Sequence, residues 1–273
     1  MTLTAYDFLY LPTMREIQFV KYEGTGNDFI LINNLSGNYD FLSFTMITHL
    51  CDRKFGIGAD GLILINVDST SDFYMDYFNA DGSKSFCGNG SRCAVLYTYA
   101  LGIHKGTTTF NAIDGKHAAS LLNNVVAIKM CDVIEIHQFN NAYVLNTGSP
   151  HYVEFNDDLT NENIVRTGKE IRYSEPFKKE GINVNLVRKI AVQKIEIVTY
   201  ERGVEDETLS CGTGATACAL VHNYLSKSND NAVQVVVKGG ELSVSFKRES
   251  EGKYSQIVLS GPANFVFQGT IHV

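Results

Sequence analysis

Apolar and polar residues alternate in many short runs, and this pattern predicts a chain built mainly from β-strands. Glycine-rich or polar connections separate these runs. Gly239 and Gly240 separate the last two runs and predict a hairpin. We expect strands at IQFVKY (17–22), DFILIN (28–33), LILINV (62–67), DFYMDYFN (72–79), AYVLNTG (142–148), PHYVEF (150–155), INVNLV (182–187), IEIVTY (195–200), AVQVVVK (232–238) and ELSVSF (241–246).

A helical period of apolar positions appears in three other segments. The first runs from Phe44 to Phe55, and Gly56 ends it. The second follows the CGNG turn at Cys87 and closes at Gly102. The third is GATACALVHNYL (214–225), which the CGTG turn opens. The alternation of strands with a few helices predicts a mixed α/β (α+β) fold.

The two cysteine turns belong to a longer internal repeat. SFCGNGSRC (85–93) resembles LSCGTGATAC (209–218), and Phe78-Asn79 before the first turn matches Tyr200-Glu201 before the second. The repeat predicts two similar halves, with a boundary in the turn-rich segment 111–116. We therefore expect one half over 15–111 and another over 112–261. A final strand over about 262–273 is expected to return to the first half, and residues 1–14 form an extension outside the fold.

Composition favours a folded protein that acts on small molecules. The chain has 273 residues, of which 44% are hydrophobic and 19% charged. A net charge of -7 and the lack of long basic runs argue against nucleic-acid binding. Residues 1–14 lack a basic leader, and no run of about 18 apolar residues predicts a membrane span. Six cysteines without an export signal predict a reducing, cytoplasmic location.

Each cysteine turn combines a thiol with a helix N-terminus. Unpaired N–H groups and the helix dipole favour an anion there, so we expect a thiol that ionises easily. The same N–H groups can hold a carboxylate, because glycine lets a ligand approach the backbone. If the halves face each other, a carbon between the turns meets Cys87 on one face and Cys211 on the other. Inversion of a stereocentre requires this arrangement.

Other interpretations of these motifs remain open. Cysteine is commonly a small buried hydrophobic residue, an interpretation that we assign to Cys51, Cys93, Cys131 and Cys218. A disulfide between the two turn cysteines is a lesser alternative. Metal binding is disfavoured because Cys218 lies about 10 Å along the helix from the turn cysteine. The GIGADG run matches a dinucleotide fingerprint but follows a helix and opens a strand, and CGTGATA lacks the lysine of a phosphate loop.

Six ordered blocks resemble those of the diaminopimelate epimerase family. The blocks are KYEGTGNDFILIN, KFGIGADGLILI, FNADGSKSFCGNGSRC, GSPH, INVNLV and YERGVEDETLSCGTGA, and the resemblance runs from about residue 17 to the C-terminus. It implies two pseudo-symmetric halves, each a mixed sheet wrapped around a central helix, with the active site in the cleft between them. It also implies interconversion of LL- and meso-diaminopimelate without a cofactor or metal, and a homodimer with no partner other than its amino-acid substrate.

The resemblance also implies residue roles. Cys87 and Cys211 are the catalytic thiolate and thiol pair, whose roles exchange with the direction of reaction. Substrate binding is implied for the backbone N–H groups of the two turns and for several side chains. These residues are Asn27, Asn79, Gly88, Asn89, Ser149, Asn183, Glu201, Arg202, Gly212 and Thr213.

Within that set, the resemblance distinguishes the two ends of the substrate. The turn N–H groups hold the reacting carboxylate, and Asn27 lies near that end. Glu201 accepts from the distal ammonium group and Arg202 pairs with the distal carboxylate. Asn79 and Asn183 add hydrogen bonds at the distal end.

The chain departs from many relatives at Ser149, where they have asparagine, and from some at Gly61, where they have glutamine. His151 is interpreted either as shaping the site or as a packed, hydrogen-bonded residue. These departures keep open a related racemase or isomerase that has the same fold and another substrate. A non-catalytic protein that binds an amino acid or a nucleotide is the alternative from a different class.

Overall fold

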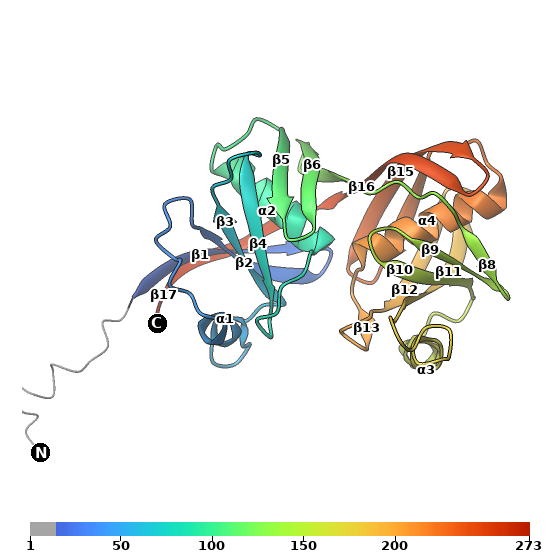
Figure 1. Cartoon of the computed structure of the whole chain (residues 1–273), viewed down its shortest axis with the longest axis horizontal. Helices are drawn as coiled ribbons and strands as arrows, with labels where there is room; N and C mark the ends of the chain where they lie inside the picture. The colour runs from blue at the N-terminus through green and yellow to red at the C-terminus, as the bar shows by residue number, and fades with distance from the viewer. Residues whose placement is uncertain (1–14) are drawn as a thin grey trace, which may run out of the picture.

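The computed structural model describes residues 15–273, which form two halves that lie side by side, each with one central helix (Figure 1). The helices are α1 (Phe44–Cys51), α2 (Gly88–Ala100), α3 (Asn161–Arg172) and α4 (Gly212–Ser226). The strands are β1 (Glu16–Gly24), β2 (Asn27–Asn33), β3 (Gly61–Asn66), β4 (Phe73–Asn79), β5 (Thr107–Ala112), β6 (Gly115–Leu122), β7 (Val125–Lys129), β8 (His137–Phe139), β9 (Ala142–Asn146), β10 (Pro150–Phe155), β11 (Asn183–Ala191), β12 (Lys194–Tyr200), β13 (Glu207–Thr208), β14 (Ala232–Val237), β15 (Gly240–Ser250), β16 (Lys253–Pro262) and β17 (Asn264–His272).

The two halves repeat one order of connections. In the first half β2 pairs parallel with β3 across α1, β3 pairs antiparallel with β4, and α2 leads to β5, which is parallel to β4. In the second half β10 pairs parallel with β11 across α3, β11 pairs antiparallel with β12, and α4 leads to β14, which is parallel to β12. Two further antiparallel strands continue each sheet, β6 and β7 in the first half and β15 and β16 in the second. The predicted mixed α/β fold is confirmed.

Strand pairing also links the halves to each other. β7 pairs antiparallel with β16, so the two sheets are hydrogen-bonded at this edge. The C-terminal β17 pairs antiparallel with β1 and therefore lies in the first half. Because β6 and β7 continue the sheet from β5, we propose a boundary after β7 in place of residue 111.

The central helices are buried because their sequences are rich in small and apolar residues. α2 contacts strands from β1 to β7, and α4 contacts strands from β9 to β16. One hydrophobic core contains residues of both helices, among them Cys93, Ala94, Ala217 and Cys218. Small side chains allow the sheet to curve closely around each helix. The two helices also contact each other.

The predicted helix over 44–55 is four residues shorter in the structure and ends at Cys51. Asp52 takes an extended conformation, and its Oδ1 accepts hydrogen bonds from the N–H groups of Lys54 and Phe55, both at 2.7 Å. This side chain competes with the helical backbone and forms a turn. The GIGADG run follows this turn and leads into β3, so it lacks the helix that dinucleotide binding requires. The hairpin at Gly239 and Gly240 is confirmed.

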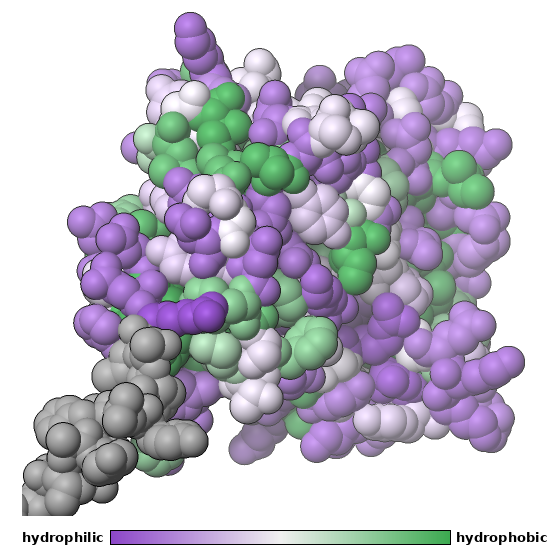
Figure 2. Space-filling model, turned by 60° about the vertical axis from the view of Figure 1, so that its left-hand side comes forward, coloured by the Kyte–Doolittle hydropathy of each residue, from purple (hydrophilic) through white to green (hydrophobic). Residues whose placement is uncertain are grey.

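The surface is mainly hydrophilic on the face shown in Figure 2, where apolar side chains form a few separate groups. None of the helices within residues 15–273 has the length and hydropathy needed to cross a membrane.

Candidate active site

Cys87 and Cys211 occupy matching positions in the two halves. Each is the N-cap residue of a central helix, with φ -131° and ψ 113° at Cys87 and φ -122° and ψ 111° at Cys211. The extended cap conformation directs the first N–H groups of each helix away from the helix body. The structure therefore contains the two predicted turns, each of which places a cysteine thiol beside the N–H groups at a helix N-terminus.

The two turns meet across the boundary between the halves. Asn89, in the first turn of α2, donates through Nδ2 to the carbonyl oxygen of Ser210 at 3.1 Å, immediately before Cys211. Ser210 Oγ in turn accepts from Thr25 Oγ1 at 2.9 Å, and Arg92 donates to Thr25 Oγ1 at 2.8 Å. These buried polar contacts fix the helix ends relative to each other.

The hairpin of the second half closes against the same region. A Cβ atom at Gly239 would overlap the backbone carbonyl of Thr25, so only glycine allows this approach. Gly239 N–H also donates to the carbonyl of Leu209 at 2.9 Å. The glycine therefore holds together the first-half turn, the β14–β15 hairpin and the segment that leads to Cys211.

The expectation that these thiols ionise easily is wrong in this structure. Burial raises the pKa of Cys87 to about 11 and that of Cys211 to about 12. The Glu201 carboxylate raises both pKa values further. Opposing effects come from the Gly90 N–H, which donates to Cys87 Sγ at 3.4 Å, and from Thr213 Oγ1, 3.5 Å from Cys211 Sγ. Desolvation outweighs the helix N-termini here.

Asn27 and Asn89 form a polar chain beside Cys87. Asn27 donates to Asp60 Oδ2 at 2.9 Å and accepts from Asn89 Nδ2 at 2.7 Å. Asp60 also pairs with Arg53 at 2.7 Å, which fixes its orientation. Asn89 is 3% exposed, yet its Oδ1 has no hydrogen-bond partner among the described residues. This oxygen is 3.9 Å from a Cβ built on Gly212.

A buried polar network lies behind Cys211. His151 Nε2 is 2.9 Å from Thr213 Oγ1, and Asn185 Nδ2 is 3.1 Å from His151 Nδ1. Because the Asn185 amide donates to Nδ1, the proton of neutral His151 belongs on Nε2 and is donated to Thr213. Thr199 completes the network with a hydrogen bond to Asn185 Oδ1 at 2.9 Å.

Burial keeps His151 neutral. It lowers the pKa of His151 to about 3, and the nearby Arg202 charge adds to this effect. His151 is thus a packed and hydrogen-bonded residue that also touches the Cys211 turn. Our sequence analysis missed Asn185 and Thr199. The available signal was the amide of Asn185 within the otherwise apolar run INVNLV.

The residues expected at the distal substrate end form a second group. Asn183 donates to Ser149 Oγ at 2.8 Å and accepts from the Arg202 N–H at 2.9 Å. Arg202 donates to Ser149 Oγ at 3.4 Å and to the Glu180 carbonyl at 3.0 Å. Ser149 therefore joins the cluster by its hydroxyl.

Glu201 and Asn79 differ in their surroundings. Burial raises the pKa of Glu201, and no cation within 15–273 forms a salt bridge with it. The Asn79 amide instead donates to Ser83 and Ser85 within its own turn. The structure thus places Glu201 as a half-buried carboxylate without a cation and Asn79 in a locally bonded turn.

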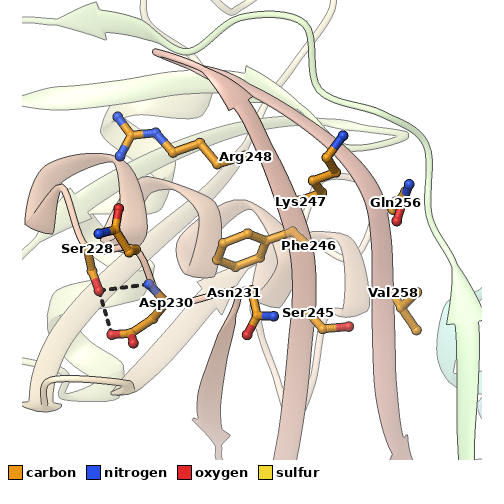
Figure 3. Close-up of a pocket in the computed structure, with 10 residues that line it drawn as sticks. Ser228, Asp230, Asn231, Ser245, Phe246, Lys247, Arg248, Gln256 and Val258 are labelled. Carbon is orange, nitrogen blue, oxygen red and sulfur yellow. Dashed lines mark hydrogen bonds between the residues drawn. The ribbon is translucent and has the colours of Figure 1, made fainter.

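Other features show no comparable chemistry. A surface pocket of about 710 Å³ lies between the α4–β14 connection and strands β15 and β16, and its lining contains none of the predicted site residues. Figure 3 shows Lys247 and Arg248 with their charged ends pointing apart, and Ser228 bonded to Asp230. All six cysteines are free, and residues 15–273 contain no group of three side chains suited to a metal ion.

Comparison with solved structures defines the class of fold. A PhzF-family phenazine biosynthesis protein from Bacillus anthracis superposes with a TM-score of 0.71 at 14% identity, covering 95% of this chain and 99% of that one. A hydroxyproline epimerase from Agrobacterium vitis gives a TM-score of 0.67 at 12% identity, covering 96% and 93%. The chain therefore has the fold shared by PhzF-type proteins and this epimerase.

Sequence comparison identifies the family. The family model for diaminopimelate epimerase matches residues 19–132 and 143–266. The diaminopimelate epimerase of Flavobacterium psychrophilum is 48% identical over 257 residues, which cover 93% of this chain and 100% of the relative. The chain belongs to the diaminopimelate epimerase family, which is a family of isomerases.

Proposed function

We propose that this protein interconverts LL- and meso-diaminopimelate by proton transfer between Cys87 and Cys211. The observation that carries the proposal is the meeting of two cysteine-capped helix N-termini, bridged by the hydrogen bond from Asn89 to Ser210. One thiolate removes the α-proton and becomes a thiol. The opposite thiol gives its proton to the other face of the carbon and becomes a thiolate, so the total charge is unchanged.

The helix N-termini support this reaction by holding the carboxylate of the reacting centre. As the α-proton leaves, negative charge moves onto that carboxylate. The N–H groups of the residues after each cysteine stabilise this charge, because they are already oriented and need no reorganisation. The residues proposed for this task are Gly88, Asn89, Gly212 and Thr213. The unpartnered Asn89 Oδ1 is an acceptor, so it supports a ligand N–H group beside this carboxylate.

Glu201 explains how buried thiols of high pKa can react. Its carboxylate disfavours both thiolates in the structure. A substrate ammonium group that pairs with Glu201 would offset this charge, so the fraction of thiolate would increase when the correct substrate binds. We propose that Arg202, with Ser149 and Asn183, holds the distal carboxylate, while Asn79 and Asn27 add hydrogen bonds.

A cytoplasmic homodimer completes the proposal. β17 pairs with β1, and within residues 15–273 no other strand register includes it. The side chains of Phe265 and Val266 on this strand are about half exposed. An unpaired apolar edge strand favours pairing with a second copy. Sedimentation of the native chain and of Val266→Asp tests this, and a monomeric native chain would contradict it.

The catalytic proposal is tested by single Cys87→Ala and Cys211→Ala variants. Native protein is incubated with LL-diaminopimelate in deuterated solvent, and both α-deuterium incorporation and meso product are followed without pyridoxal phosphate. We expect epimerisation in the native protein and a loss of about 100- to 10,000-fold in each variant. Full-rate inversion by both variants would overturn the mechanism. A panel of other amino acids tests the alternative of a related racemase with the same fold and another substrate.

A further inference from the structure

Tyr77 has a hydroxyl at the candidate site that the roles described above do not use. The residue is 6% exposed, and its hydroxyl makes no hydrogen bond to any residue in 15–273. Its oxygen is not among the fully buried polar atoms of residues 15–273 that lack a partner, so it keeps contact with solvent and is accessible to a bound group.

Strand register places Tyr77 at the edge of the sheet that carries the site. It lies on β4, two residues before Asn79, and alternation puts both side chains on the same face. Asn79 pairs with Gly61, which directly follows Asp60, the partner of Asn27. Tyr77 therefore belongs to the same local surface as the residues beside Cys87.

Gly61 explains how the hydroxyl reaches this position. A Cβ atom at Gly61 would be 2.8 Å from Tyr77 Oη and would overlap the Tyr77 ring and the Phe78 carbonyl. The tyrosine thus packs directly over the glycine backbone. Phe29 supports the ring from another side, with centroids 5.9 Å apart at 73°. The phenol is held rigidly with its polar end at the site.

The surrounding charges indicate which substrate group the hydroxyl meets. Burial raises the pKa of Tyr77 well above its usual range, and the nearby Cys87 sulfur and the Asp60 and Glu201 carboxylates add to this effect. The phenol is therefore neutral, and its neighbours are acceptors or anions. A substrate ammonium group is favoured in this field, whereas a carboxylate is repelled. The helix N-termini already provide donors for the reacting carboxylate.

We propose that the Tyr77 hydroxyl accepts a hydrogen bond from the amino group of the reacting centre, and so positions the α-carbon against Cys87. This inference rests on the proposed epimerase function. Tyr77 is then a substrate-contacting residue on β4, beside the polar chain of Asp60, Asn27 and Asn89.

The test uses Tyr77→Phe, which keeps the ring and its packing and removes only the hydroxyl. Tyr97→Phe is the matched control, because Tyr97 is also buried and without a hydrogen bond but lies near the far end of α2. We expect Tyr77→Phe to lower kcat/KM for LL-diaminopimelate about 10- to 100-fold, as for loss of a hydrogen bond to a charged group. Tyr97→Phe should match the native protein, and both variants should keep its melting temperature.

Inhibition by pimelate, the same diacid without amino groups, separates the two ends of the substrate. If Tyr77 binds the amino group, Tyr77→Phe leaves the inhibition constant of pimelate unchanged. An equal weakening of pimelate and diaminopimelate would overturn the assignment to the amino group. Unchanged kcat/KM in Tyr77→Phe, with an active native protein, would overturn the inference alone. A native protein that neither exchanges the α-hydrogen nor inverts diaminopimelate would overturn the proposed function, and this inference with it.

Discussion

The two halves support their cysteines with different side chains on the same backbone plan. Strand register makes three positions of the first half equivalent to three of the second. Two residues of each set lie next to the third residue of the helix in their half, Gly90 or Gly214. The first-half positions are mostly apolar, whereas the second-half positions are polar and hydrogen-bonded. The equivalent pairs are Phe29 with His151, Ile63 with Asn185, and Tyr77 with Thr199.

Because of this difference, the two copies of a duplicated turn surround their thiols with different exposure and different hydrogen-bond partners. Cys87 is partly exposed, and its sulfur accepts from the Gly90 N–H. Cys211 is 8% exposed, and its nearest polar partner is the hydroxyl of Thr213. Because His151 donates to Thr213, the Thr213 proton is free to stabilise a Cys211 thiolate. The first half achieves the same with backbone alone.

We expect the largest difference between the halves, in stability and in kcat/KM, when the glycine at the third helix position is replaced by alanine. A Cβ at Gly214 would be 2.6 Å from Asn185 Oδ1, which buried hydrogen bonds hold in place. A Cβ at Gly90 would be 3.2 Å from the flexible end of Ile63. We expect Gly214→Ala to destabilise the protein by about 1–3 kcal/mol. It should also lower kcat/KM roughly 100-fold, because the Cys211 turn moves.

Gly90→Ala is the matched variant, since it makes the same chemical change at the equivalent helix position. Its effects on the unfolding free energy and on kcat/KM should both be smaller than those of Gly214→Ala. Denaturant unfolding and steady-state kinetics provide the two measurements. Equal effects of the two variants would show that the polar network makes no difference to rigidity.

The second largest effect is expected from His151→Phe. This variant gives the second half the residue type of the equivalent first-half position, Phe29. Its pKa of about 3 in the folded protein is below the usual value of 6.5, so the unfolded chain binds the proton first. The stability that neutral His151 contributes is present above pH 6.5 and is lost as the pH falls toward 3. The slope is about 1.4 kcal/mol per pH unit. We expect the stability of His151→Phe to depend less on pH in this range.

The measurement for His151 is urea unfolding of both proteins from pH 7 to pH 4. The difference between their pH slopes removes the contribution of the carboxylates that both share. We also expect kcat/KM of the variant to fall about 10-fold, because Thr213 loses its donor. Identical pH slopes would contradict a neutral, buried His151.

Local patterns allowed most of the fold to be predicted, and tertiary context accounts for what was missed. Alternation of apolar residues located the principal strands, and the CGNG and CGTG turns located both central helices. Helix α3 was missed because Gly168 lies in its middle, where a side chain would overlap Tyr200. A glycine required by packing resembles a helix breaker in the sequence.

For the site as well, the sequence predicts what depends on neighbouring residues in the chain, but not what depends on tertiary contacts. Residues 87 and 211 could be selected because cysteine, glycine and a helix start are adjacent in the chain. Their raised pKa values could not be predicted, because desolvation depends on what covers the sulfur after folding. The link from Thr199 through Asn185 to His151 depends on the register between three strands, which no single run of residues specifies.

The smallest effect is expected from removing the Glu201 carboxylate, whose charge influences the pKa values of both thiols. Glu201 raises the pKa of Cys87 and that of Cys211, but burial is the larger cause in each case. Glu201→Gln removes the negative charge and keeps a polar side chain of similar size, so both thiol pKa values should fall only modestly. The rate of alkylation by iodoacetamide, followed against pH with each modified cysteine identified by mass, reports the two values. Glu196→Gln is the control, because Glu196 pairs with Arg188 on the surface of β12. If Glu201→Gln shifts neither profile relative to this control, Glu201 does not couple the two halves, and each thiol is controlled by its own burial alone.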